Sequence, residues 1–201
     1  MLILASRSPT RRKLLADAGF SFAAEPVEID ERGLEAAWRA EGAAPAHIAR
    51  RLAATKAATV AERHPEAVVI GADQVLVVEG ELLHKADDLA AARAQLDRLR
   101  GRAHRLHAGV ALAVAGRTVW EHVETAELVM RHFSDADRDA IVAAEGDAVL
   151  GSVGCYRLEG PSVRLFESVR GDYFTILGLP LLALIDALRR FAPDELETIA
   201  P

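Results

Sequence analysis

The strongest constraint on the fold comes from the first twenty residues, where a buried strand leads directly into a helix. Residues 2–5 (Leu-Ile-Leu-Ala) form a short apolar run that predicts the strand. Ser8 and Pro9 follow, and these residue types favour the N-cap and the first position of a helix. Gly19 is a natural residue to end that helix. The chain therefore begins as an α/β protein, with a strand-to-helix turn whose free N–H groups favour an anion.

Three cations surround this turn, namely Arg7, Arg11 and Arg12. Positive side chains are stabilised at the C-terminal end of a helix, so their place at the N-terminal end is slightly unfavourable. A bound anion would offset that effect, and the pattern therefore predicts a phosphate-binding turn. A solvated, purely structural helix surface is the alternative reading of the same arginines.

Composition excludes several classes of protein. The chain has 201 residues, of which 51% are apolar and 27% charged, as in ordinary folded domains. A net charge of −6 argues against a general nucleic-acid-binding surface. The single cysteine, Cys155, excludes an internal disulfide and a cysteine-rich zinc site. There is no apolar run near the length of a membrane span and no secretory leader pattern. We expect a cytoplasmic protein without a membrane or nucleic-acid partner.

Strand and helix patterns alternate along the chain, which predicts α/β architecture. Helices are expected after Ser8, from Pro45, after Asp88, after Ser134 and after Pro180. Extended segments are expected at residues 2–5, 20–29, 67–70, 74–78, 82–83, 106–114, 118–129 and 163–169. No linker or repeat divides the sequence. Residues 1–201 are therefore expected to form one domain, or two lobes that share a long sheet around a cleft.

Asp73 is the best candidate for a catalytic carboxylate. It follows the apolar residues 68–70 and the small pair Gly71-Ala72, so it is expected at the end of a strand, where open α/β sheets bind ligands. A carboxylate there can bind a divalent metal or accept a proton from water. A turn-capping aspartate is an equally weighted alternative.

Further charged residues suit a nucleotide site. Asp30 and Glu31 form a second acidic group, and Lys56 and Lys85 are isolated cations. In such sites a metal bridges carboxylates and phosphates while Lys and Arg neutralise the remaining oxygens. Each of these residues taken alone is more often structural. The P-loop, dinucleotide-binding, nucleophile-elbow and zinc-protease motifs are absent.

Taken together, the spaced motifs resemble those of the Maf proteins, which are nucleotide pyrophosphatases also described as septum-formation inhibitors. They occur in the family order from residue 2 to about residue 190. They comprise Leu2-Ile3-Leu4-Ala5-Ser6, Ser8-Pro9-Thr10-Arg11-Arg12, Arg51-Leu52-Ala53, Lys56-Ala57, Gly71-Ala72-Asp73, Lys85, Leu99-Arg100-Gly101, His104, Gly171-Asp172-Tyr173 and Gly178-Leu179-Pro180-Leu181.

The resemblance implies an α/β fold with a long mixed twisted sheet flanked by helices, two lobes around a central cleft, and a homodimer. It also implies hydrolysis of a nucleoside triphosphate to the monophosphate and pyrophosphate with a divalent metal (Mg²⁺, Mn²⁺ or Co²⁺). By position, Asp73 is the general base, and Glu31 with Asp73 binds the metal. The residues implied to hold the triphosphate are Ser6, Arg11, Arg12, Lys56 and Lys85.

Three positions bear on the base that is recognised. Gln74 stands where many Maf proteins carry Thr, and Glu159 stands where the thymidine- and uridine-preferring branch usually has Gln. The Asp73-Gln74-Val75 run and the Leu165-Phe166-Glu167 segment are similar to the branch acting on 7-methyl-GTP, and a glutamate at position 159 can accept from the N1–H and amine of guanine. Thr10 departs from that branch, which often has Trp there. Two alternatives stay open: a nucleotide-binding regulator of septum formation with incidental hydrolysis, and a phosphatase that releases single phosphates.

Overall fold

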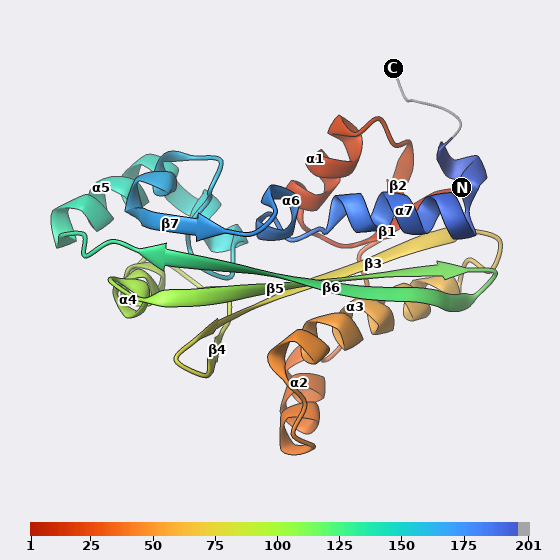
Figure 1. The fold of residues 1–201 in the computed structure, drawn as a ribbon, viewed down its shortest axis with the longest axis horizontal. Coiled ribbons are helices and arrows are strands. Elements are labelled where there is room, and N and C mark those ends of the chain that lie inside the picture. The colour runs from red at the N-terminus through yellow and green to blue at the C-terminus, as the bar shows by residue number, and fades with distance from the viewer. Residues whose placement is uncertain (197–201) are drawn as a thin grey trace. The chain divides into compact units, whose positions relative to one another are not determined.

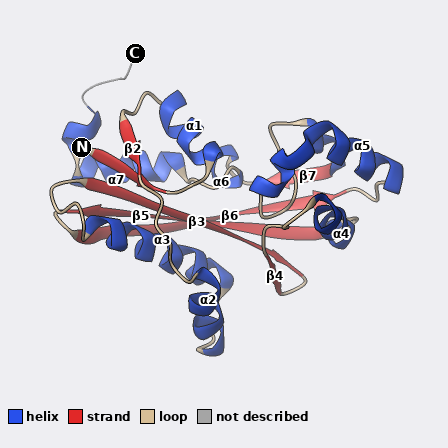
Figure 2. Cartoon of the chain, turned by 180° about the vertical axis from the view of Figure 1, so that it is seen from behind, coloured by secondary structure: helices blue, strands red, loops and turns tan. Residues whose placement is uncertain are grey.

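The computed structural model describes residues 1–196, which form seven helices and seven strands (Figures 1 and 2). The helices are α1 (Pro9–Asp17), α2 (Glu31–Ala40), α3 (Pro45–Ala61), α4 (Leu89–Leu99), α5 (Asp135–Glu145), α6 (Tyr173–Ile176) and α7 (Leu181–Phe191). The strands are β1 (Leu2–Ala5), β2 (Phe22–Ala24), β3 (Val68–Val78), β4 (Glu81–Leu83), β5 (Ala103–Val114), β6 (Arg117–Met130) and β7 (Phe166–Arg170). Three 3-10 turns are η1 (Gly146–Gly151), η2 (Pro161–Leu165) and η3 (Pro193–Leu196).

The strands of the described residues form one mixed sheet in the order β2-β1-β3-β5-β6-β7, with β4 paired to β3. β1 lies parallel to both β2 and β3, whereas β4 and β7 pair antiparallel with β3 and β6. The predicted α/β class with a long mixed sheet is therefore confirmed. The chain divides into two compact units, and β3, β5 and β6 each contribute residues to both. Unit 1 comprises residues 1–74, 107–124 and those from 173 onward, and unit 2 comprises residues 75–106 and 125–172.

In unit 1 the sheet lies between two helical layers. Because successive side chains of a strand point to opposite faces, Leu2 and Leu4 of β1 join the apolar cluster of α1 and α7. Ile3 and Ala5 instead join the cluster of α3. Figure 1 shows α1 and α7 on one side of these strands and α3 on the other. Both faces of the β1 strand are thus covered, as its uninterrupted apolar run indicates.

Helix α3 lies unusually close to the sheet because two glycines face it. A Cβ added to Gly71 would lie 2.1 Å from the carbonyl oxygen of Ala53, and one added to Gly109 would lie 2.3 Å from that of Ala49. No side chain therefore separates the backbones at these points. This close approach brings Lys56 of α3 against β3.

Unit 2 has its own buried core around α4, α5 and the strand ends. One of its buried polar contacts joins His104 Nε2 to the hydroxyl of Tyr156 at 2.8 Å, with the ring of Phe166 packed against Tyr156 edge-on. Burial lowers the pKa of His104 to about 4, so this histidine is neutral at physiological pH. Burial also raises the pKa of Tyr156.

The predicted helix starts are confirmed at each capping residue tested. Ser8 and Asp88 accept from the backbone N–H three residues on, and Ser134 forms a reciprocal capping box with Asp137. Helices α2 and α6 were not predicted. The strand expected at 163–169 is a 3-10 turn as far as Leu165, and only residues 166–170 are extended. No helix within residues 1–196 is long and apolar enough to span a membrane.

Candidate active site

Asp73 lies inside β3, not at the end of that strand as predicted. A strand end nevertheless lies next to it, because the parallel neighbour β1 ends with Ala5 opposite Gly71. Asp73 is therefore two residues beyond the carboxyl end of β1, on the same face of β3 as Gly71 and Val69. That face carries α3. It is the end of the neighbouring strand that places Asp73 at a ligand-binding position of the sheet.

Lys56 joins two carboxylates. Its Nζ lies 2.5 Å from Oδ1 of Asp73 and 2.7 Å from Oε1 of Glu31. The side chains of Lys56 and Asp73 are 10% and 9% exposed, whereas that of Glu31 is 50% exposed. Glu31 is the first residue of α2, and Asp30 before it is the N-cap, accepting from the N–H of Gly33 at 2.9 Å. Of the two predicted acidic residues, only Glu31 reaches Lys56, and Asp30 has a structural role.

Burial is the largest influence on the pKa of Asp73. Burial raises the pKa of this carboxyl above its ordinary value, and the cations Lys56 and Arg11 only partly oppose that effect. Within the described residues, the hydrogen bonds of the Asp73 carboxylate involve Oδ1 alone. Oδ2 is therefore available to accept a proton or bind a cation, which suits a general base with a raised pKa.

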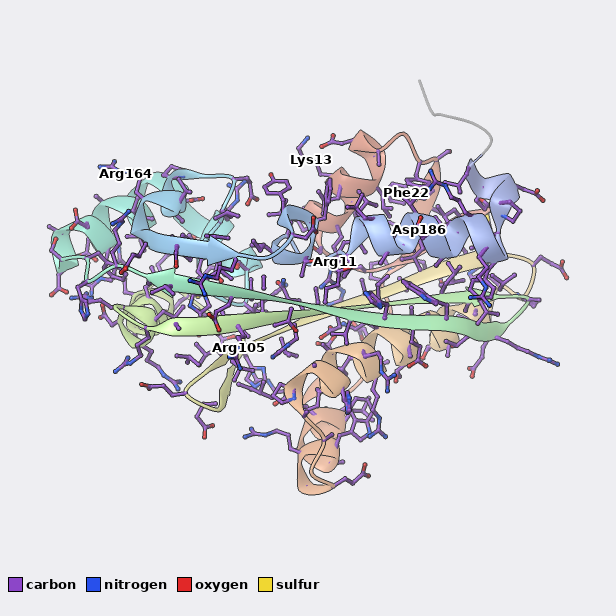
Figure 3. The ribbon with its side chains drawn as sticks, viewed as in Figure 1. Arg11, Lys13, Phe22, Arg105, Arg164 and Asp186 are labelled. Atoms are coloured by element: carbon purple, nitrogen blue, oxygen red, sulfur yellow. The ribbon has the colours of Figure 1, made fainter. Side chains whose placement is uncertain are left out.

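Arg11 is buried and forms hydrogen bonds with three segments of unit 1. Its Nε donates to the carbonyl of Gly178 at 2.7 Å, and its Nη1 donates to Ser6 Oγ at 3.1 Å and to the carbonyl of Ala72 at 2.9 Å. These bonds join the residue after β1, the residue before Asp73 and the turn between α6 and α7. Figure 3 labels Arg11 among the side chains. Burial lowers the pKa of Arg11. Arg11 thus contacts the residue before Asp73, and Ser6 contacts Arg11; their part in substrate binding stays a prediction.

The other residues of this strand-to-helix turn are less buried than Arg11. Arg12 is exposed, and its side chain makes no ion pair or hydrogen bond with any described residue. Thr10 is half-buried. Arg7 forms a surface ion pair with Glu28. Of the three arginines, Arg12 is the one whose guanidinium is left free for an anion.

Gln74 lies next to Asp73 in sequence but on the opposite face of β3. Its Nε2 donates to the carbonyls of Thr175 and Ile176 at 3.1 and 3.0 Å, while the hydroxyl of Thr175 donates to Glu124 Oε2 at 2.5 Å. The amide predicted to read the base is therefore bound to the backbone of α6. Thr175 and Glu124 were not predicted, and no local motif marks either residue.

Lys85 and Glu159 belong to unit 2. Lys85 is exposed and follows β4. Glu159 accepts from Nε of Arg157 at 3.3 Å, and its side chain is 25% exposed. In unit 1 the contacts form two groups: Ser6 lies against Arg11, and Lys56 lies against Glu31 and Asp73.

The available donors favour a metal that arrives with substrate. Among residues 1–196, no three His, Cys, Asp or Glu side chains are grouped as ligands for a metal ion. Asp73 and Glu31 supply two carboxylates around one ammonium. Mg²⁺ is commonly bound by one or two carboxylates together with substrate phosphates and water. The donor set fits that arrangement and not an all-protein cage.

Comparison with known proteins identifies the family. Residues 1–191 match the family described as Maf-like protein. The chain belongs to the Maf family. It is 50% identical over 189 residues to a nucleoside triphosphate pyrophosphatase of Granulibacter bethesdensis, covering 94% of this chain and 96% of that protein. It is 47% identical over 189 residues to a 7-methyl-GTP pyrophosphatase of Brucella abortus, covering 94% and 95%.

A third relative of this Maf protein is a nucleoside triphosphate pyrophosphatase of Caulobacter vibrioides, 48% identical over 186 residues and covering 92% and 93% of the two chains. The solved structure of a nucleoside-triphosphatase / dITP/XTP pyrophosphatase of Mycobacterium abscessus covers 95% of this chain and 97% of its own. Its TM-score is 0.46 at 18% identity, a likeness too weak to carry an inference. The resemblance to Maf proteins drawn from the motifs is confirmed, while the role of each site residue stays a prediction.

Proposed function

We propose that this Maf protein hydrolyses nucleoside triphosphates between the α and β phosphates, releasing the monophosphate and pyrophosphate. The observation that carries the proposal is the placement of Asp73 beyond the end of β1, with its Oδ1 2.5 Å from Nζ of Lys56. The hydrogen-bonded pair Arg11 and Ser6 lies at the same end of β1. The names of its relatives support the same reaction.

In the proposed mechanism, Asp73 accepts a proton from water as the water oxygen forms a bond to the α phosphorus. The bond from the α phosphorus to the bridging oxygen breaks, and pyrophosphate leaves with that electron pair. Lys56 holds the Asp73 carboxylate in place during this transfer, and the exposed guanidinium of Arg12 is available for phosphate oxygens. Fixed cations of this kind stabilise charge that develops in the transition state.

A divalent metal is part of the proposal. Glu31 and Asp73 would hold Mg²⁺, Mn²⁺ or Co²⁺ together with oxygens of the substrate, and the metal would neutralise charge on the phosphates. The proposals of a homodimer and of a cytoplasmic location rest on the resemblance to the family and on composition. Light scattering on the purified protein tests the first of these two.

We propose 7-methyl-GTP as the preferred substrate. Glu159 supports this choice, because a carboxylate complements both the donor edge of guanine and the positive charge of its methylated ring. A relative from Brucella abortus bears the name 7-methyl-GTP pyrophosphatase. The contribution of Gln74 to base selection is indirect in this proposal, since its amide is bound to the carbonyls of Thr175 and Ile176.

The test is Asp73→Asn, which keeps the shape of the side chain and removes its basicity. With Mg²⁺ or Mn²⁺ and a panel of triphosphates including 7-methyl-GTP, ion-exchange chromatography should show monophosphate and pyrophosphate from the wild type. The variant should lose turnover by roughly 100- to 10,000-fold, the usual contribution of a general base. Asp186→Asn, an exposed change on α7 of the same unit, is the matched control and should keep full activity.

Three other outcomes contradict the proposal in different ways. Retained turnover in a clean preparation of Asp73→Asn would exclude this carboxylate as the base. Diphosphate and inorganic phosphate as products would establish the phosphatase alternative. Absence of turnover with every triphosphate would favour the regulator of septum formation.

A further inference from the structure

Glu145 is a buried carboxylate of unit 2 that the proposed mechanism does not use. It is the last residue of α5, and its side chain is only 1% exposed. A negative charge is disfavoured both by burial and by the C-terminal end of a helix. A residue kept there needs strong compensating contacts, and those contacts come from one short segment of the chain.

That segment comprises residues 157–162. Oε1 of Glu145 accepts from the N–H of Ser162 at 3.1 Å and from its hydroxyl at 2.7 Å. Oε2 accepts from Nη1 of Arg157 at 3.4 Å. A Cβ added to Gly160 would lie 2.6 Å from Oε1, so a larger residue would displace the carboxylate. Three residues of the segment are thus fitted to Glu145.

Arg157 continues the chain of contacts to Glu159. While its Nη1 faces Glu145, its Nε donates to Oε1 of Glu159 at 3.3 Å. The guanidinium is planar and rigid, so fixing one edge against Glu145 also fixes the edge that faces Glu159. The three side chains carry two negative charges and one positive charge, so one negative charge is left unbalanced. The Glu145 side chain is 1% exposed, whereas those of Arg157 and Glu159 are 39% and 25% exposed.

We propose that Glu145 is a positioning residue that orients Glu159 through Arg157 and thereby sets nucleobase selectivity. This inference rests on the proposed function, in which Glu159 faces a cationic guanine. Glu145 does not touch the nucleotide in this proposal. Its role is to hold residues 157–162 in the arrangement in which Arg157 bridges the two carboxylates, so that the charge of the partly exposed Glu159 is only partly neutralised.

The test compares kcat/KM for 7-methyl-GTP with kcat/KM for UTP. Glu145→Gln keeps an acceptor for Ser162 but places an NH₂ group against the guanidinium of Arg157. Arg157→Lys leaves the buried carboxylate intact and removes the planar fork. Each variant should lower the selectivity ratio by roughly 10-fold, the size expected for one hydrogen bond to a charged group. Glu159→Gln should do the same, and combining it with Glu145→Gln should add no further loss.

Asp147→Asn is the matched control, because Asp147 is an exposed carboxylate two residues from Glu145, and its ratio should equal that of the wild type. Two outcomes would overturn the positioning role alone. In one, Glu145→Gln or Arg157→Lys lowers kcat/KM equally for both nucleotides. In the other, Glu159→Gln changes the selectivity ratio while Glu145→Gln and Arg157→Lys leave it unchanged. An unchanged ratio in Glu159→Gln would overturn both base recognition by Glu159 and its positioning. Wild-type protein that hydrolyses neither nucleotide would refute the proposed function itself.

Discussion

Replacing Gly71 by alanine tests how the active site is assembled. The new Cβ would lie 2.1 Å from the carbonyl oxygen of Ala53 and 2.7 Å from the backbone nitrogen of Ala57. Because real Cβ contacts do not fall below 3.0 Å, α3 must recede from β3 by about 0.9 Å. If Lys56 follows its helix, the 2.5 Å contact with Asp73 lengthens to about 3.4 Å, beyond a good hydrogen bond.

Overpacking of this kind costs about 1–3 kcal/mol of unfolding free energy, and the lower entropy of the unfolded alanine chain returns only about 0.4–1 kcal/mol. Gly71→Ala should therefore be less stable and less active. Urea unfolding and steady-state pyrophosphate release measure the two effects. Gly151→Ala is the control, since a Cβ there meets nothing within 4 Å. Wild-type stability and turnover in Gly71→Ala would refute the view that this glycine sets the distance between Lys56 and Asp73.

Three further predictions concern charge. Because burial raises the pKa of Asp73, kcat should fall on the acid side at a pH above the ordinary aspartate value of about 4; an acid limb at or below that value would contradict the assignment. Glu31→Gln should raise the Mg²⁺ concentration needed for half-maximal activity by roughly 10-fold, and an unchanged requirement in a metal titration would remove Glu31 from the metal site. The pKa of His104 is lowered to about 4, so as the pH falls this histidine is protonated in the unfolded chain before it is protonated in the folded one. The free energy of unfolding should therefore fall by about 3 kcal/mol between pH 6.5 and pH 4. Urea unfolding at pH 7 and pH 4.5 should show a smaller fall for His104→Gln.

Local features of the fold were predictable because their causes are local. Ser8, Asp88 and Ser134 each cap a helix through contacts within three residues. The missed helix α2 has Leu34 and Trp38 four residues apart, the spacing of one helical face. Gly33 in its first turn weakens that pattern, because glycine disfavours helix interiors. Helix α6 has only four residues, too few for any periodicity.

The candidate site was predictable in composition but not in arrangement. The motif resemblance named Ser6, Arg11, Lys56 and Asp73, and in the structure Ser6 contacts Arg11 and Lys56 contacts Asp73. The sequence could not show that Arg11 is bound to Gly178, because that contact spans 167 residues. The same reason hid Glu145, whose contacts with Ser162 lie 17 residues away. Contacts between distant segments depend on how elements pack, which no local pattern records.

The alternation of side chains between the two faces of β3 limits how the sequence of such a protein can change. Asp73 faces α3 and Gln74 faces α6, although the two residues are consecutive. A substitution at one position is therefore shielded from the environment of the other by the sheet itself. A one-residue insertion upstream in the strand would place the carboxylate at the position that faces the carbonyls of α6. A one-residue deletion would place the amide at the position beside Lys56. Point changes at Gln74 are thus open to variation, whereas the length of the strand before it is not.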